Sequence, residues 1–441
     1  MAKTVTEKMK TAAKMSGGIV NKHSVKDISK FPGPPHIRAW GGRFLRSLVL
    51  TELCSGLLSG SEAFTKAGVA VEPGDIIDKE VNFFPYYVHK MGYEKAASNH
   101  VHLGTEDGDI LKKKIEDFRG CDVLMAGPPC PPWAGPGSKD GEFNPQADVF
   151  WKVVEIIKWL GCHGLKVFAI ETVVGVTHML GGRTPFIRKV LAVLREGLPH
   201  FTISYDKISV SDVSTLPHNR TRVWIRGALS VFLTSFPETL PGILRNDDPQ
   251  EDLMNFLNLS LPNADMRELT RPQKKNLGDQ ERYIKRLKRN MGWPSVGRVA
   301  CFDISRKQGG VYSALGRYDG ACIPLTCKNY KIFITSTFDI HLPRSQRAVC
   351  RFMHPCERFV QQGHSPDGAQ CFLKNGAVKA AGNAYAVNQC HAVLEPFFDD
   401  LEKSQLITPI ADFSKQHEYV PSIQTPQKRR RLLRRPAAQK P

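Results

Sequence analysis

Residues 121–133 read CDVLMAGPPCPPW, and our prediction of the fold begins from them. Its apolar run of about six residues is typical of a buried strand. The run stops at Gly127, and Pro128 and Pro129 then impose a rigid turn. Cys130 therefore follows the carboxyl end of a strand, the edge where open α/β sheets bind ligands. A free cysteine is also often only a small buried apolar residue, and the stretch alone leaves both interpretations open.

Short apolar runs alternate with helical stretches on both sides of this strand. The expected strands are 47–53, 74–78, 122–126, 167–170, 201–210 and 223–225. The expected helices lie near 59–67, 82–90, 147–160 and 185–196. This alternation predicts an α/β fold with a parallel, doubly wound sheet.

Composition divides the chain into five segments. The first is polar, basic and interrupted by glycine and proline, which favours a flexible arm, with an organelle transit segment as the alternative. The second holds the alternation of strands and helices, the third is irregular with short β-like runs such as 330–335, and the fourth is a C-terminal helix. The last is a basic tail that we expect to be disordered. The segments are 1–45, 46–235, 236–375, 376–405 and 406–441.

The formal charge of +18 is concentrated at the two ends of the chain. Residues 1–45 hold nine Lys/Arg against two acids, and residues 421–441 hold seven against none. The run 428–435 is typical of a nuclear localisation signal or a nonspecific DNA-binding arm, although a tail without function remains an alternative. Between the ends, the most basic stretch is 271–298, which is either a nucleic-acid surface or a solvated helix face.

Other classes of protein are disfavoured by composition. The eleven cysteines show no paired framework, which indicates a reducing intracellular compartment rather than a secreted disulfide scaffold. No apolar run reaches eighteen residues, so we expect no membrane span. The sequence predicts no metal site.

Polar residues and a small-residue loop follow several of the expected strands. Residues 52–60, ELCSGLLSG, form a loop that lets backbone approach a ligand, although such a loop is as often a tight turn. Asp78 and Asp109 can bind ribose hydroxyls of a nucleoside cofactor or can be solvated charges. Glu171 closes a buried strand, where it can hold a proton near neutrality or form a structural ion pair.

Three arginines follow in residues 216–227, LPHNRTRVWIRG. In a strand, Arg220, Arg222 and Arg226 point to one face, because side chains alternate with a period of two. A phosphate or a carboxylate such as Glu171 would neutralise them. The alternative is a solvated edge strand.

The order of these motifs resembles the C5-cytosine DNA methyltransferases that use S-adenosylmethionine. Residues 54–68 resemble the Phe-x-Gly-x-Gly-Gly motif, 127–137 the Pro-Cys nucleophile loop, and 171–173 the Glu-Asn-Val motif. Residues 218–222 resemble Gln-x-Arg-x-Arg, 351–363 faintly resemble the ninth motif, and 382–387 resemble the final Gly-Asn-x-Val. The resemblance covers about 46–227 and 345–400. It implies a Rossmann-like methyltransferase sheet with a smaller, irregular target-recognition domain at 236–375, and a C-terminal helix that returns to the catalytic domain.

The resemblance also implies roles for individual residues. Cys130 would add to C6 of a cytosine flipped out of double-stranded DNA, and Glu171 would bind and protonate N3. Arg220 and Arg222 would orient Glu171 and the nucleotide and help to lower the pKa of the cysteine. The basic stretch 271–298 would contact DNA phosphates. The residues expected to bind S-adenosylmethionine are Cys54, Ser55, Gly56, Asp78, Asp109, Ile110, Pro129, Asn383 and Ala384.

The chain departs from the family pattern at six positions, which are Leu58, Ser59, Pro131, Ala134, Thr172 and His218. Leu58 and Ser59 replace a glycine pair at the cofactor loop. These departures leave a catalytically silent DNA-binding relative as an alternative. A tRNA methyltransferase is a second alternative, although the Cys-Phe-Thr signature of that branch is missing from the sequence. We expect an intracellular protein, nuclear if the source is eukaryotic.

Overall fold

The computed structural model describes residues 27–134, 140–179, 184–232, 240–291, 297–304, 316–325, 331–372 and 376–406. Its larger lobe is built on a seven-stranded sheet with strand order β3-β2-β1-β4-β5-β7-β6. In chain order the strands are β1 (Leu48–Leu53), β2 (Val71–Asp78), β3 (Val101–Leu103), β4 (Val123–Ala126), β5 (Val167–Thr172), β6 (Phe201–Ile208) and β7 (Arg222–Leu229). All six expected strands are present, and β3 is an additional strand that the sequence pattern did not indicate.

The sheet is mixed, which corrects the prediction of a parallel sheet. Strands β1 to β5 pair in parallel, whereas β7 is antiparallel to both β5 and β6. Parallel neighbours need a crossover connection, usually a helix. Only a one-turn 3-10 helix, Val210–Asp212, lies between β6 and β7, so the chain turns back beside the strand that it has just left.

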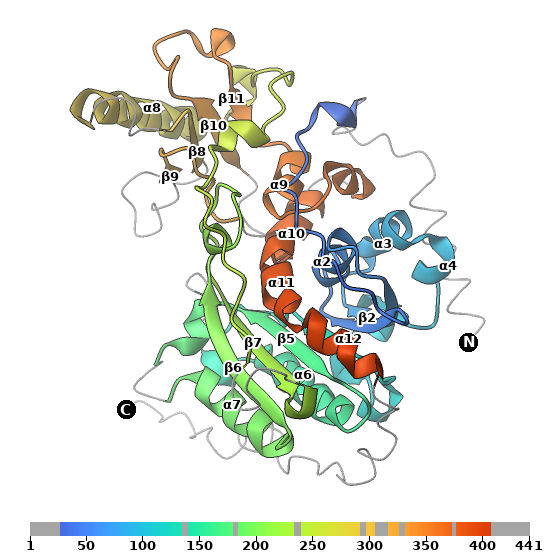
Figure 1. The fold of residues 1–441 in the computed structure, drawn as a ribbon. Helices are drawn as coiled ribbons and strands as arrows, with labels where there is room; N and C mark the ends of the chain where they lie inside the picture. The colour runs from blue at the N-terminus through green and yellow to red at the C-terminus, as the bar shows by residue number, and fades with distance from the viewer. Residues whose placement is uncertain are drawn as a thin grey trace, which may run out of the picture.

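Helices cover both faces of this sheet (Figure 1). On one face, α6 (Ala147–Gly161) and α7 (Phe186–Gly197) bury the apolar stripes that their sequence periodicity predicts. On the other face lie α2 (Ser59–Lys66), α11 (Val387–Leu394) and α12 (Phe398–Leu406). The short helices α3 (Phe84–Met91), α4 (Tyr93–Ala96) and α5 (Gly104–Asp107) flank β2 and β3.

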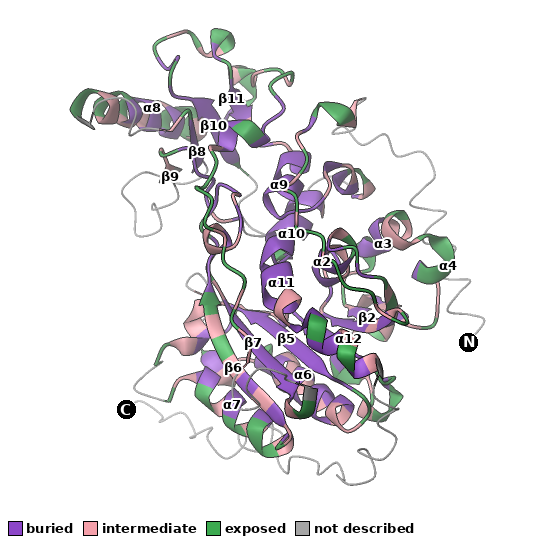
Figure 2. Ribbon diagram, viewed as in Figure 1, coloured by how far each residue is buried: buried purple, intermediate pink, exposed green. Residues whose placement is uncertain are grey.

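The C-terminal part of the chain returns to the larger lobe. The predicted single helix over 376–405 is instead three helices, α10 (Gly376–Asn383), α11 and α12. Every residue of α11 is buried, because the helix packs against the sheet and against α2 in one apolar cluster (Figure 2). Helices α2 and α11, which are more than 300 residues apart in the chain, thus share one core.

The smaller lobe is more regular than its sequence indicated. It contains an antiparallel sheet, ordered β11-β10-β8-β9, and the long helix α8 (Arg271–Met291). The strands are β8 (Val299–Asp303), β9 (Gly316–Arg317), β10 (Ile332–Ser336) and β11 (Cys350–Phe352), and α9 (Pro355–Gln361) leads back towards the larger lobe. Strands of two to five residues are too short to give a clear alternating pattern, so the sequence indicated only the region around β10.

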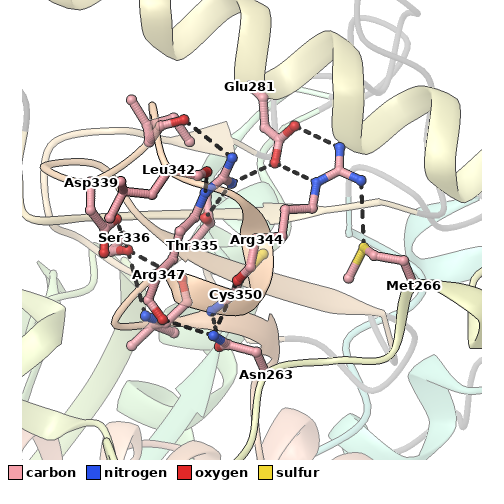
Figure 3. A network of polar contacts seen from close by, with 12 residues as sticks. Asn263, Met266, Glu281, Thr335, Ser336, Asp339, Leu342, Arg344, Arg347 and Cys350 are labelled. Atoms are coloured by element: carbon pink, nitrogen blue, oxygen red, sulfur yellow. Dashed lines mark hydrogen bonds and ion pairs between the residues drawn. The ribbon is translucent and has the colours of Figure 1, made fainter.

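A buried polar network attaches α8 to the small sheet (Figure 3). Glu281, on α8, binds Arg344 through both carboxylate oxygens, at 2.9 and 2.6 Å. Its Oε1 atom also lies 2.6 Å from Nη1 of Arg347, which in turn donates to backbone carbonyls of the 340–342 turn. One acid therefore neutralises two arginines and fixes the helix on the lobe.

Part of the predicted flexible arm is packed against the larger lobe. Phe31 is buried, the Trp40 backbone N–H donates to Ala67 O, and the Trp40 indole N–H donates to Asp399 Oδ1 at 2.9 Å. Residues 1–26 of the arm and the tail from 407, including the basic run 428–435, lie outside the described residues. Among the described helices, none combines the length and the apolar character that a membrane span requires.

Candidate active site

The carboxyl ends of four parallel strands lie in one row across the large sheet. Backbone pairing joins Ile77 to Leu53, Leu53 to Ala126, and Ala126 to Ile170. The residues that follow this row are therefore neighbours at one edge of the sheet. They are Asp78, Cys54, Gly127 and Glu171.

The turn after β4 holds Cys130 at this edge. The Cys130 carbonyl accepts hydrogen bonds from the backbone N–H groups of Trp133 and Ala134, both at 3.0 Å. The Trp133 ring stacks on Phe186 with centroids 4.3 Å apart, which anchors the turn to α7. The thiol is half-buried, so the turn offers it to the edge without exposing it fully.

Close approach explains the glycine in this turn. A Cβ atom on Gly127 would lie 2.9 Å from Cε1 of Tyr385. Tyr385 is buried and makes an edge-on contact with Trp224, the residue that pairs with Glu171 across the sheet. The turn is thus fitted against the segment between α10 and α11.

An ion pair adjoins Cys130. Glu171 Oε1 lies 2.6 Å from Arg222 Nε, and both side chains are largely buried. This contact supports the expectation that Arg222 orients Glu171. Thr172, the next residue, is fully buried, and its hydroxyl has no hydrogen-bond partner among the described residues.

The surroundings of Cys130 hold its thiol protonated at neutral pH. Burial raises the pKa of Cys130 and the charge of Glu171 raises it further, while Arg222 and Arg220 act in the opposite direction. The arginines therefore lower the cysteine pKa as we expected, but burial and Glu171 outweigh them. A nucleophilic thiolate at this position needs additional positive charge or loss of the proton to a bound partner.

The three arginines do not converge on one anion, which corrects the expectation from their spacing. Arg222 binds Glu171, whereas Arg226 binds Asp206 at 2.9 Å on the neighbouring strand. Arg220 Nη1 donates to the carbonyls of Leu325 and Gly382, at 2.7 and 3.1 Å. Arg220 precedes β7, so the period of two that holds within the strand does not extend to it.

His218 ties the same motif to the smaller lobe. It is fully buried, and its Nε2 atom lies 2.6 Å from the carbonyl of Gln361 in α9. Burial lowers the pKa of His218 to about 3, so the ring is neutral and donates its Nε2 proton to that carbonyl. Together with the hydrogen bonds of Arg220, this contact fixes residues 218–220, which precede β7, to the smaller lobe and to α10.

The loop between β1 and α2 is open at Gly56. Gly56 has a positive φ of 51°, and a Cβ atom there would meet nothing within 4 Å. Its backbone N–H donates to Asp78 Oδ2 at 2.8 Å, and the Glu80 N–H donates to Asp78 Oδ1 at the same distance. Burial nevertheless raises the pKa of Asp78 to about 6, because these hydrogen bonds offset only part of the desolvation. An open backbone beside a buried carboxylate suits a ligand that carries hydroxyl groups.

Leu58 and Ser59 fit into the protein interior instead of projecting from the loop. The Leu58 side chain is only 2% exposed and belongs to the apolar cluster that includes Tyr86 and Tyr87 of α3. Leu58 also has a positive φ of 52°, a conformation that costs a residue other than glycine on the order of 1–3 kcal/mol. Ser59 is buried, and its hydroxyl donates to Tyr385 O at 2.8 Å.

Several residues that sequence reasoning missed hold this loop. The Tyr87 hydroxyl lies 2.7 Å from Ser55 Oγ and 3.1 Å from Gly56 O. Glu52 is fully buried and accepts from the Gly60 N–H at the start of α2, and burial raises its pKa to about 7. No motif distinguishes Tyr87 in the sequence. Glu52 is the first residue of the loop 52–60, but the sequence pattern indicated no role for it.

The remaining predicted residues lie on three other segments. Asp109 forms an ion pair with Lys79 at 2.9 Å and caps the turn that begins at Ile110, which is buried. Pro129 belongs to the turn that leads to Cys130. At the other end of the chain, exposed Asn383 ends α10, and buried Ala384 follows it directly.

Comparison with known proteins identifies one family. The model of the C-5 cytosine-specific DNA methylases matches residues 50–397. Among curated proteins, the type II methyltransferase M.NlaIV of Neisseria lactamica is 29% identical over 158 residues, 35% of this chain and 34% of that protein. The type II methyltransferase M.HgiCI of Herpetosiphon aurantiacus is 26% identical over 161 residues, 36% of this chain and 33% of that protein. The match thus spans about a third of the length of these relatives.

Solved structures share the fold. The methyltransferase EhMeth of Entamoeba histolytica is 17% identical with a TM-score of 0.50, covering 81% of this chain and 99% of its own. A DNMT2 variant of Spodoptera frugiperda is 14% identical with a TM-score of 0.52, covering 80% of this chain and all of its own. At these identities the likeness concerns the architecture alone.

Proposed function

The chain belongs to the C-5 cytosine-specific DNA methylase family, and on this premise we propose that it transfers a methyl group from S-adenosylmethionine to C5 of cytosine in double-stranded DNA. The observation that carries the proposal is the juxtaposition of the Glu171–Arg222 ion pair with the half-buried Cys130 thiol. A carboxyl group, a cation and a thiol are the three groups that activation of the cytosine ring requires.

In the proposed reaction, Cys130 supplies the nucleophile. The thiol proton of Cys130 passes to the Glu171 carboxylate, the thiolate forms an Sγ–C6 bond with a flipped cytosine, and Glu171 delivers the proton to N3, which neutralises the charge that develops on the ring. The electron pair then available at C5 would bond to the methyl group of S-adenosylmethionine, whose carbon–sulfur bond breaks and leaves the sulfur as a neutral thioether. A base then removes the C5 proton, the Sγ–C6 bond breaks and the N3 proton returns to Glu171, which restores the aromatic ring and the thiolate. Arg222 keeps Glu171 oriented throughout these steps.

The residues of the β1–α2 loop suit S-adenosylmethionine, whose sulfonium carries the reactive methyl group. Gly56 leaves its backbone accessible, and Asp78 offers a carboxylate to ribose hydroxyls. Leu58, in place of a family glycine, turns into the apolar cluster beneath the loop. We propose that Asp109 and Asn383 complete the binding site at its two ends.

We propose that α8 contributes to DNA binding. Its buried side, which includes Leu277 and Ile284, packs on the small sheet. Its exposed side carries Lys274, Lys275, Lys285, Arg286 and Arg289. Such a surface attracts phosphates without reading sequence.

For a eukaryotic host, we further propose that the run 428–435 directs the protein to the nucleus, which a fluorescent fusion lacking residues 406–441 would test.

A labelling experiment tests the activity. Protein and S-adenosylmethionine with a labelled methyl group are incubated with duplex DNA or with tRNA, and Cys130→Ala is compared with the wild type and with Cys162→Ala. We expect label in DNA cytosine for the wild type and Cys162→Ala, and none for Cys130→Ala. A covalent complex between Cys130 and DNA that contains 5-fluorocytosine would identify the nucleophile. Label in tRNA alone, or binding of DNA without any transfer, would establish one of the two alternatives instead.

A further inference from the structure

His364 has no part in the chemistry proposed above, yet it contacts the loop proposed to bind S-adenosylmethionine. It lies three residues beyond α9 and is fully buried. Its Nε2 atom lies 3.0 Å from the hydroxyl of Ser59, a residue 305 positions away in the chain. Its Nδ1 atom lies 3.3 Å from the hydroxyl of Tyr86. One imidazole therefore joins the start of α2 to α3.

The neighbouring carbonyls define the direction of these hydrogen bonds. The Ser59 hydroxyl donates to Tyr385 O, because a carbonyl can only accept, so Ser59 Oγ accepts the Nε2 proton of His364. Burial lowers the pKa of His364 well below its usual range, and Lys90 and Lys66 lower it further. The ring is thus neutral, and its Nδ1 lone pair faces the Tyr86 hydroxyl, whose single proton is shared between Nδ1 and the carbonyl of Leu57.

These contacts reach both sides of Leu58, which with Cys54 is one of two residues other than glycine that have a positive φ in this loop. The Tyr86 hydroxyl also lies 3.1 Å from the carbonyl of Leu57, while Ser59 directly follows Leu58. Leu58 has the left-handed conformation that glycine adopts easily and leucine does not. A strained residue persists only where its surroundings determine its conformation. His364 connects the two groups that do so.

We propose that His364 is a positioning residue for the S-adenosylmethionine-binding loop, acting through Ser59 and Tyr86 to hold Leu58, and with it Gly56, in the conformation that receives the ligand. This inference rests on the proposed function, because it takes S-adenosylmethionine as the ligand of the loop. His364 contacts neither the Cys130 turn nor Glu171 in the described hydrogen bonds. Its loss should therefore weaken binding of the methyl donor and leave the cytosine chemistry intact.

Calorimetric binding of S-adenosylmethionine to the full chain, without DNA, tests this inference. We expect His364→Phe and Ser59→Ala each to raise the dissociation constant about tenfold, which is the loss of one buried hydrogen bond. Because the two residues act through one contact, the double variant should bind no more weakly than either single variant. Unchanged affinity in His364→Phe, or fully additive losses, would overturn the proposal. Ser59→Ala alone decides the matter if His364→Phe does not fold.

His391→Phe provides a matched control. His391 is also buried, but on α11 its ring faces Glu395 and Phe398 and makes no described hydrogen bond to Ser59 or Tyr86. We expect it to lower the melting temperature without changing the affinity for S-adenosylmethionine. In methyl transfer, His364→Phe should raise the KM for S-adenosylmethionine and leave kcat unchanged. A wild type that binds S-adenosylmethionine but transfers no methyl group to DNA would refute the proposed function and leave this inference standing.

Discussion

Arg222 Nε lies 2.6 Å from Glu171 Oε1, and the two residues come from strands that run in opposite directions. Glu171 lies near the carboxyl end of β5, and Arg222 is the first residue of β7. In a parallel pair, the first residue of β7 would lie at the opposite edge of the sheet. The antiparallel direction of β7 is therefore what brings the arginine to the carboxylate.

Removal of the Arg222 charge should shift the pH dependence of methyl transfer. Arg222 lowers the pKa of the Cys130 thiol, so Arg222→Gln should raise that pKa and move the rise in rate to higher pH. We expect a shift of about one pH unit, equivalent to roughly tenfold in rate at neutral pH. Rates measured between pH 6 and pH 10 check this. Arg226→Gln, on the same strand but paired with Asp206, is the control and should leave the profile in place.

Glu171→Gln should separate thiol reactivity from catalysis. The charge of Glu171 raises the pKa of Cys130, so its removal should lower the pKa and speed alkylation of the thiol by iodoacetamide at neutral pH. Methyl transfer should nonetheless fall, by about 100-fold or more, because glutamine cannot protonate N3. Mass spectrometry of the peptide that contains Cys130 measures the first effect. Slower alkylation would contradict the electrostatic argument, whatever the effect on transfer.

Binding of S-adenosylmethionine should strengthen as the pH rises through about 6. Burial raises the pKa of Asp78 to about 6, and ribose hydroxyls donate best to the ionised carboxylate. A ligand that prefers the ionised form gains affinity as the proton is lost and gains no more above that pH. Titrations at pH 5, 6 and 7.5 measure the trend. Asp78→Asn should bind weakly with a flat profile, and a profile as steep as that of the wild type would assign the dependence to another group.

Loss of Glu281 should destabilise the smaller lobe. Glu281→Ala leaves Arg344 and the buried Arg347 without their shared carboxylate (Figure 3). Breaking a buried ion pair in this way typically costs about 3–5 kcal/mol. We expect the smaller lobe to unfold at a lower urea concentration, which hydrogen exchange in α8 detects. Binding of S-adenosylmethionine to the larger lobe should be retained. Asp265→Ala, which breaks the exposed pair with Arg267, should leave the urea midpoint almost unchanged, because solvent screens exposed ion pairs.

The exposed side of α8 should determine the salt dependence of DNA binding. Replacing Lys285 and Arg286 together by glutamate should weaken binding and reduce the slope of log affinity against log salt by about one unit per lost phosphate contact. Fluorescence anisotropy between 50 and 200 mM salt measures this slope. Lys95→Glu on α4, at the opposite side of the molecule from α8 in Figure 1, should leave it unchanged. An unaltered slope in the α8 variant would show that DNA does not bind to the exposed side of α8.

The strand ends at which the candidate site is built can be predicted from the sequence. Apolar runs followed by Asp78, Pro128 and Glu171 are local signals, because a buried strand and the turn that ends it involve only neighbouring residues. The positions of Cys130, Gly56 and Arg222 in the candidate site followed from the same patterns and from the order of the motifs.

Long-range packing sets the direction of β7, the separate partners of Arg220 and Arg226, and the contact of His364 with Ser59. These features join residues that are distant in sequence or depend on which strand lies beside another, and local periodicity carries no information on either. The same holds for the orientation of Leu58, which replaces a glycine of the family pattern. In the structure, packing against α3 turns this side chain inward, because burial of an apolar surface offsets the strain of its backbone.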